Sequence, residues 1–148
     1  MAIHRRPLGS GRTLAAIAGA VIIVGCVLPW WRRGGDATGL PALTGYAFED
    51  VGIIVFLVGV ATLALVALPY AVGDRPTGID RWMSYAVLSI AGWAAFAWRL
   101  VQLIALDVFR FAEPTQVFTN GPGLWIAGLG LAVLSRAVWR MTREPLYR

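Results

Sequence analysis

Four long apolar runs, separated by short polar segments, dominate the hydrophobic pattern of the chain. A run of about 20 apolar residues is long enough to cross the hydrocarbon core of a bilayer as a helix. The pattern therefore predicts an all-α membrane protein, with residues 1–148 forming a single domain built as a bundle of four transmembrane helices. The expected helices are residues 13–31, 47–72, 82–106 and 121–141.

The polar segments between the runs predict how the helices are connected. Residues 32–46 are rich in turn formers and form a first outer loop with room for short strands. Glu49 and Asp50 are expected in the first turn of the second helix, where acidic side chains complement the helix dipole. Asn120 is expected to cap the fourth helix, with Pro122 in its first turn.

Small residues recur at helical spacing in the apolar runs. The first run contains Ala15-x-x-x-Gly19, and the fourth contains Gly123-x-x-x-Ala127. Such spacing lets two helix backbones approach closely. These faces are therefore expected to pack against neighbouring helices.

The placement of arginine predicts the orientation of the bundle. The 13 basic residues are all arginine; nine lie on the side of the two termini, three on the other side, and Arg99 lies within a run. An excess of basic residues marks cytoplasmic segments. We therefore expect a multi-pass protein with both termini in the cytoplasm, and we interpret the net charge of +5 as a topology signal, with no nucleic-acid partner.

Composition narrows the chemistry that the chain can perform. It is 58% hydrophobic and only 14% charged, against about a quarter charged residues in an average soluble domain. No Asp, Glu or His lies in the interior of an apolar run, and one histidine and one cysteine cannot form a metal cluster within one chain. The sequence therefore predicts no catalytic residue, no bound metal and no cofactor.

Arg99 is the one charged residue well inside an apolar run. It follows Trp82 by 17 residues, which places it roughly 25 Å along the third helix, in the outer third of the bilayer. Three roles are open: the guanidinium snorkels to the outer headgroups, forms an ion pair with Glu49 or Asp50, or contacts an anion or a lipid headgroup. An ion pair would fix the register of the second and third helices, because loss of one partner of a buried pair is strongly destabilising.

Asp107 is a further acidic candidate on the outer side. It lies within about 80° of Arg99 around the third helix, so it could share a structural ion pair or a headgroup contact with that arginine. Glu49, Asp50 and Asp107 could also hold a divalent cation together, although solvated acids are the usual state of such residues.

Two tryptophans and a glutamine surround Arg99 in sequence. Trp93, Trp98 and Gln102 could line a ligand cavity in the third helix. Alternatively, the two tryptophans face lipid or pack within the protein, as such residues more often do.

The amino-terminal region also fits a secretion signal. A basic segment, an apolar segment and Ile23-Val24-Gly25-Cys26 match a broadened form of the sequence that is cleaved and lipidated at cysteine in bacterial lipoproteins. The apolar run continues past Cys26, as a retained helix would. Intact mass distinguishes the two readings, because cleavage before Cys26 would remove the whole amino-terminal segment.

Two short motifs carry a resemblance to known proteins: Leu28-Pro29-Trp30-Trp31 and Gly121-Pro122-Gly123-Leu124-Trp125. With the glycine-rich outer loop, they make the chain similar to a group of small uncharacterised bacterial four-helix membrane proteins. That resemblance implies the bacterial inner (plasma) membrane as its location. The layout also resembles the claudin-like family by analogy only, because the loop cysteines of that family are missing.

These features favour a non-enzymatic integral membrane protein. We expect an accessory or scaffold subunit of a larger membrane assembly, whose partners are membrane lipids and other membrane protein subunits or further copies of itself. The alternative is a small lipid- or anion-binding or transport protein with a cavity near Arg99.

Overall fold

The computed structural model describes residues 9–35, 39–72, 82–109 and 115–143. Over this part of the chain, four helices are long and apolar enough to cross a membrane. They are α1 (Ser10–Val27), α2 (Gly52–Val72), α3 (Trp82–Ala105) and α5 (Pro122–Arg143). The prediction of an all-α bundle of four spanning helices is confirmed.

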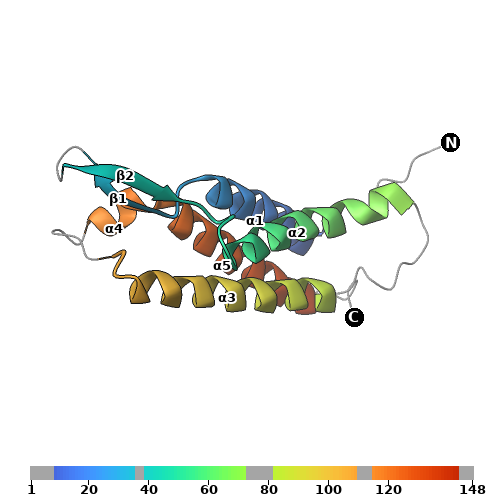
Figure 1. Ribbon diagram of the computed structural model, residues 1–148. Helices are drawn as coiled ribbons and strands as arrows, with labels where there is room; N and C mark the ends of the chain where they lie inside the picture. Colours follow the sequence, from blue (N-terminus) through green and yellow to red (C-terminus); the bar gives the residue numbers. More distant parts are fainter. Residues whose placement is uncertain (1–8, 36–38, 73–81, 110–114, 144–148) are drawn as a thin grey trace.

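The four helices pack as a closed ring. α1 packs against α2 and α5, and α3 packs against the same two helices from the opposite side (Figure 1). The most extensive of these interfaces joins α1 to α5, the first and last of the four. The interfaces that α3 makes with α2 and with α5 are both smaller than the interface between α1 and α5.

One end of the ring carries a small cap. Strands β1 (Trp31–Gly35) and β2 (Leu40–Gly45) pair antiparallel from Trp31 opposite Gly45, with a register shift between Arg33 and Gly35. The short helix α4 (Gln116–Asn120) lies at the same end (Figure 1). We call this the hairpin end, and the opposite end, where α1 begins and α5 ends, the far end. The short strands expected in the first outer loop are thus present.

Several predicted helix boundaries are wrong, each for a local reason. The first helix ends at Val27 and not at residue 31, because Leu28 is extended (ψ 154°) and the chain then enters β1. The second begins at Gly52 and not at residue 47, because Asp50 has a left-handed backbone (φ 56°) that a helix does not allow. Asn120 is the last residue of α4 and does not cap the fourth helix, whereas Pro122 opens α5 as expected.

Small residues form the interface between α1 and its neighbours. A Cβ on Gly25 would lie 2.4 Å from the Ala127 backbone nitrogen, and one on Gly19 would lie 3.0 Å from the carbonyl oxygen of Gly59. Helix backbones that approach this closely leave no room for larger side chains. The predicted packing faces around Gly19 and Ala127 are confirmed.

The two sequence motifs at the hairpin end contact one another. The Gly123 N–H donates to the Pro29 carbonyl at 2.9 Å. A Cβ on Gly121 would lie 2.3 Å from the Trp30 carbonyl oxygen, so the backbones meet directly. The fully buried Trp30 indole donates to the Gly25 carbonyl at 3.1 Å and packs edge-on against Phe96. The end of α1 and the start of α5 are therefore joined by backbone contact around one buried tryptophan.

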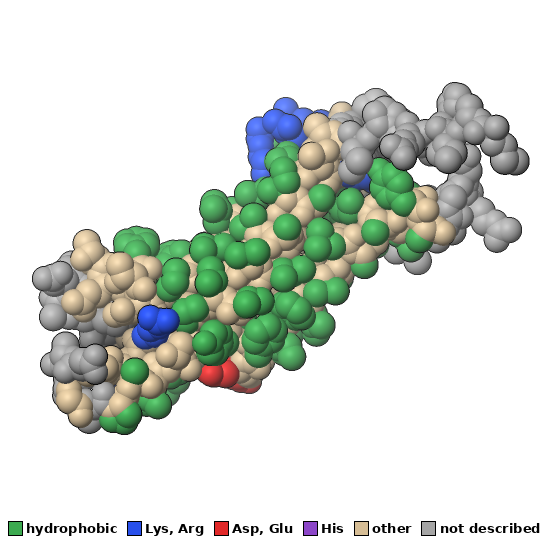
Figure 2. Space-filling view, turned by 90° about the horizontal axis from the view of Figure 1, so that it is seen from above, with side chains coloured by type: hydrophobic (Ala, Val, Ile, Leu, Met, Phe, Trp, Pro, Cys, Tyr) green, Lys and Arg blue, Asp and Glu red, His purple; other side chains and the backbone are tan. Residues whose placement is uncertain are grey.

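The outer surface of the bundle is apolar along the spans. Exposed hydrophobic side chains occur on all four spanning helices, among them Ile17, Leu57, Ile90 and Leu129. Figure 2 shows hydrophobic side chains over the middle of one face, with basic side chains toward the two ends. Such a surface matches the hydrocarbon core of a bilayer, where an apolar side chain has no reason to be buried.

Candidate functional site

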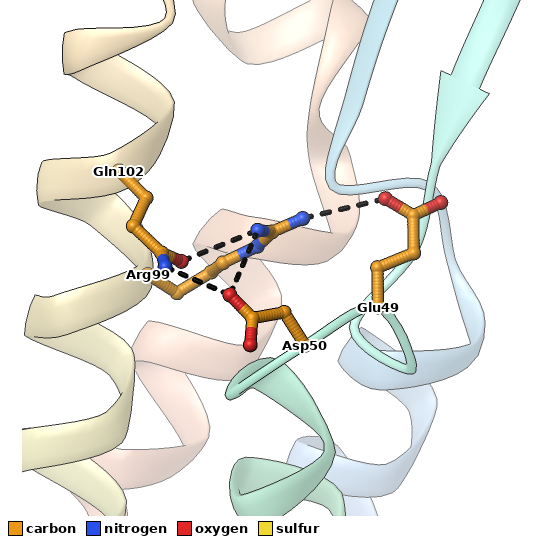
Figure 3. A network of polar contacts seen from close by, with 4 residues as sticks. All are labelled: Glu49, Asp50, Arg99 and Gln102. Carbon is orange, nitrogen blue, oxygen red and sulfur yellow. Dashed lines mark hydrogen bonds and ion pairs between the residues drawn. The ribbon is translucent and has the colours of Figure 1, made fainter.

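Arg99 pairs with two acids from the turn before α2. It lies on α3, one and a half turns before the helix ends, and its side chain is only 9% exposed. Its Nη2 lies 3.3 Å from Glu49 Oε2, and its Nη1 lies 3.9 Å from Asp50 Oδ2 (Figure 3). The structure therefore brings the arginine together with both acids that the sequence proposed as its partners.

Gln102 closes this group into a ring of polar contacts. Its Oε1 accepts from Arg99 Nη1 at 3.3 Å, and its Nε2 donates to Asp50 Oδ2 at 2.7 Å. Gln102 lies one turn after Arg99 on α3, so both side chains reach the same acid from one helix. We call Glu49, Asp50, Arg99 and Gln102 the arginine clasp. It connects α3 to the start of α2 at the hairpin end.

The local backbone before α2 presents the two acids to Arg99. Asp50 adopts a left-handed conformation (φ 56°), which aspartate tolerates better than most residues because its short side chain is compatible with that geometry. Gly52 follows, and a Cβ there would lie 2.3 Å from the Ala47 carbonyl oxygen. Residues 47–52 thus form a tight turn that turns the carboxylates toward α3 and leaves them outside the helix.

The charges in the arginine clasp do not balance. Two carboxylates face one guanidinium, and the acids are half exposed (47% and 54%) while the arginine is nine-tenths buried. The Nε of Arg99 is buried and has no hydrogen-bond partner among the described residues. An added anion would meet two negative side chains beside a guanidinium that they already neutralise, so this geometry disfavours the anion-binding role proposed for Arg99.

Asp107 lies outside the arginine clasp and has a different role. It adopts the left-handed conformation (φ 55°) directly after α3. The Asp107 N–H donates to the Ile104 carbonyl at 3.0 Å, and the Val108 N–H donates to the Leu103 carbonyl at 3.2 Å. This pattern is a Schellman motif, completed by the buried contact between Val108 and Leu103. Asp107 therefore terminates a helix, and its possible ion pair or headgroup contact stays a prediction.

The acids do not assemble into a metal site. Across residues 9–35, 39–72, 82–109 and 115–143, no three His, Cys, Asp or Glu side chains lie close enough to hold a metal ion. Hard cations such as Ca²⁺ need several oxygen ligands. Glu49 and Asp50 alone do not provide such a set.

The two tryptophans near Arg99 and Gln102 have different surroundings in the structure. Trp98 is 60% exposed and faces outward from α3. Trp93 is 39% exposed, and its indole N–H donates to the Ser135 hydroxyl of α5 at 3.0 Å. Gln102 is occupied by the arginine clasp. Trp98 is thus exposed on the outer surface of the bundle, and Trp93 contacts α5, while the ligand-cavity hypothesis for these residues stays a prediction.

A polar cluster between α3 and α5 was not predicted. Ser135 Oγ donates to the Leu131 carbonyl at 3.0 Å, and it lies 3.0 Å from Ser89 Oγ. With its proton committed to Leu131, Ser135 accepts from both Trp93 and Ser89, which satisfies the hydroxyl fully. Ser89 and Trp93 are four residues apart, so the sequence could have predicted that they lie on one face of α3. Nothing in the sequence indicated Ser135 as their partner.

An apolar groove opens between α2 and α3 on the side of the far end. It has a volume of about 580 Å³ and is lined by Ala61, Ala64, Leu65, Leu68, Ser84, Val87 and Leu88. Figure 1 shows α2 tilting away from α3 toward the far end. The small side chains of Ala61 and Ala64 and this tilt together leave the space. We call it the α2–α3 groove.

Cys26 is fully buried in α1. Its neighbour Gly25 packs directly against Ala127 of α5. Cleavage before Cys26 would remove most of the helix that forms the most extensive interface of the bundle. The lipoprotein reading stays an alternative that intact mass decides.

No protein-family model matches the chain, and comparisons with curated proteins and with solved structures find no match. The resemblance to small bacterial four-helix membrane proteins therefore stays a prediction.

Proposed function

We propose that the chain is a non-enzymatic integral membrane protein that acts as an accessory or scaffold subunit of a larger membrane assembly. The charged group inside its spans supports this proposal, because Arg99 is neutralised by acids of the same chain. The polar groups between α3 and α5 are likewise satisfied internally. Contacts with other molecules would therefore be made by the outer surface of the bundle.

The observation that carries the proposal is the α2–α3 groove. Its lining is apolar, and Ala61 and Ala64 let a second backbone approach α2 closely. The lining positions on α2 run from Ala61 to Leu68, which is about 10 Å or two helical turns. Of these positions, Ala61 and Ala64 are small and lie about one turn apart, which is the spacing through which transmembrane helices commonly contact one another. We therefore propose a transmembrane helix of a partner subunit as the occupant.

The groove also bears on the alternative function. A lipid-binding protein would use the same apolar space for an acyl chain. Anion binding near Arg99 is disfavoured by the two carboxylates of the arginine clasp. A retained lipid in the groove would therefore favour the binding protein, and a partner helix would favour the subunit.

We also propose that the far end faces the cytoplasm of a bacterial cell, with the protein in the inner membrane. The unequal division of the arginines, nine against three, supports this orientation. The bacterial membrane rests on the resemblance of the two motifs at the hairpin end. Cysteine accessibility from each side of intact cells would test the orientation.

Site-specific photocrosslinking tests the subunit proposal. A crosslinking amino acid is placed in the groove at Ala64 or Leu68. The matched control position is Ala67, which is exposed and lies about 60 to 160° from the groove positions around α2. We expect one protein adduct of defined mass from both groove positions and not from Ala67. The partner must also copurify in a fixed ratio.

Filling the groove provides the second arm. Ala64→Phe should abolish the adduct formed at Leu68 and the copurification, whereas Ala67→Phe, the same change at an exposed position outside the groove, should leave both intact. Adducts of equal yield from all three positions would mean random contact in the membrane and would refute the proposal. A lipid adduct at the groove positions would transfer the support to the lipid-binding alternative.

A further inference from the structure

The last two turns of α5 carry an exposed face with three arginines and one tryptophan. Arg136, Trp139, Arg140 and Arg143 are all exposed and lie within about 100° of one another around the helix. We call these four residues the basic face. It lies on α5 at the far end of the bundle and shares no residue with the arginine clasp or with the α2–α3 groove.

Trp139 contacts two of these arginines. The guanidinium carbon of Arg136 lies 4.2 Å from the centroid of the Trp139 ring, and that of Arg143 lies 3.9 Å from it. Their backbones are seven residues apart, about 10 Å along the axis. The ring therefore brings two cations whose backbones lie this far apart next to one indole by cation–π attraction.

No described carboxylate neutralises this face. The acids of residues 9–35, 39–72, 82–109 and 115–143 are Glu49, Asp50 and Asp107, which all lie at the hairpin end. By sequence, the segments at the far end contain nine arginines and three acidic residues. The far end therefore has an excess of positive charge, which would attract an anionic partner.

The same side of α5 continues into the bilayer as an apolar surface. Leu129 and Ala132 lie within about 40° of Arg136 around the helix, and both are exposed. Leu129 is 62% exposed. The small side chain of Ala132, one turn before Arg136, leaves room beside the helix on the bilayer side of the basic face. An apolar chain on Leu129 and Ala132 would thus end in a headgroup at the basic face.

We propose that the basic face is a binding site for an anionic phospholipid, whose phosphate is bound by the guanidiniums of Arg136 and Arg143 beside the Trp139 ring and whose acyl chain follows Ala132 and Leu129. Arginine suits phosphate because its planar guanidinium donates two parallel hydrogen bonds. The site is independent of the groove and of any partner subunit.

Native mass spectrometry of the full chain in mild detergent tests the site. The protein is titrated with phosphatidylglycerol and with phosphatidylcholine of identical acyl chains. Each arginine near the headgroup is expected to favour the anionic lipid by about fivefold. Arg136→Gln/Arg143→Gln should therefore lower the preference by roughly 25-fold, and Trp139→Leu, which keeps both charges but removes the ring, should lower it by a smaller factor.

The matched control is Arg32→Gln/Arg33→Gln, which removes two exposed arginines from β1 at the hairpin end. It should leave the preference unchanged. Equal binding of the two lipids by the wild-type chain, an unchanged preference in the Arg136/Arg143 variant, or an equal loss in the control would each overturn the proposal. Glycerol phosphate in excess should not displace the lipid; displacement would show that the site binds free phosphate and would overturn the lipid assignment.

Discussion

Neutralising both acids of the arginine clasp should destabilise the protein more than removing the arginine. In Glu49→Gln/Asp50→Asn the guanidinium of Arg99 loses both counter-charges, although its side chain is nine-tenths buried. An uncompensated buried charge of this kind lowers the free energy of unfolding by about 3 to 5 kcal/mol. In Arg99→Met the two remaining carboxylates are half exposed and can be hydrated, so we expect a loss of only about 1 to 2 kcal/mol.

The single acid variants complete a double-mutant cycle. Glu49→Gln leaves Asp50, and Asp50→Asn leaves Glu49 and still allows the bond from Gln102, so each should lower the unfolding free energy by about 1 kcal/mol. The loss in the double variant should therefore exceed the sum of the singles by about 1 to 3 kcal/mol. Asn is the matched replacement at position 50 because it also tolerates the left-handed backbone.

The assay is equilibrium unfolding of the full chain in mixed micelles of dodecylmaltoside and increasing dodecyl sulfate, followed by tryptophan fluorescence. If the double variant were no less stable than the sum of its singles, Arg99 would be exchanging its carboxylates for lipid headgroups. That result would restore the snorkelling role and refute the reasoning from burial.

Three further predictions use the same unfolding assay. Gly123→Ala should lower the unfolding free energy by about 1 to 3 kcal/mol, because its Cβ would lie 2.4 Å from the Leu28 carbonyl oxygen, whereas Gly128→Ala, which meets only the edge of a phenylalanine ring at 3.1 Å, should have a much smaller effect. Asp107→Gly should be more stable than Asp107→Ala by about 1 kcal/mol, because both remove the carboxylate but only alanine places a Cβ in the left-handed region. Ser135→Ala should lower the unfolding free energy by about 1 to 2 kcal/mol, because it removes the acceptor of the Trp93 and Ser89 bonds.

Each of these has a contradictory outcome. Equal effects of alanine at positions 123 and 128 would mean that the junction between α1 and α5 adjusts without cost. Equal stability of the two Asp107 variants would argue against the Schellman motif. An unchanged Ser135→Ala variant would show that the polar cluster between α3 and α5 contributes nothing net.

The spans were predictable because the bilayer imposes a length and an apolar composition on each helix. The third helix was expected at residues 82–106 and is observed at Trp82–Ala105. The start of the second was wrong by five residues, because Ala47 and Phe48 extend the apolar run although they belong to the turn before α2. Hydropathy does not distinguish an apolar turn that packs at the helix start from the helix itself.

The partners of Arg99 were predictable in kind and not in detail. A charge in an apolar run needs a counter-charge, and the acids nearest to the hairpin end were few. Gln102 completes the ring of contacts, and Asp107 instead terminates α3. Both outcomes depend on left-handed backbone conformations, which are those of Asp50 and Asp107. Aspartate is only one of several residues that adopt this conformation, so these two positions could not be predicted from the sequence.

The interface between α1 and α5 determines when the bundle can close during synthesis. The glycine and alanine faces of α1 are made first, yet the helix that covers them is made last of the four. Until α5 enters the membrane, α1 can pack only against α2, and its remaining small-residue face stays open to lipid or to other chains. A chain whose synthesis stopped before α5 would therefore keep this small-residue face of α1 uncovered, and its ring of helices would stay open.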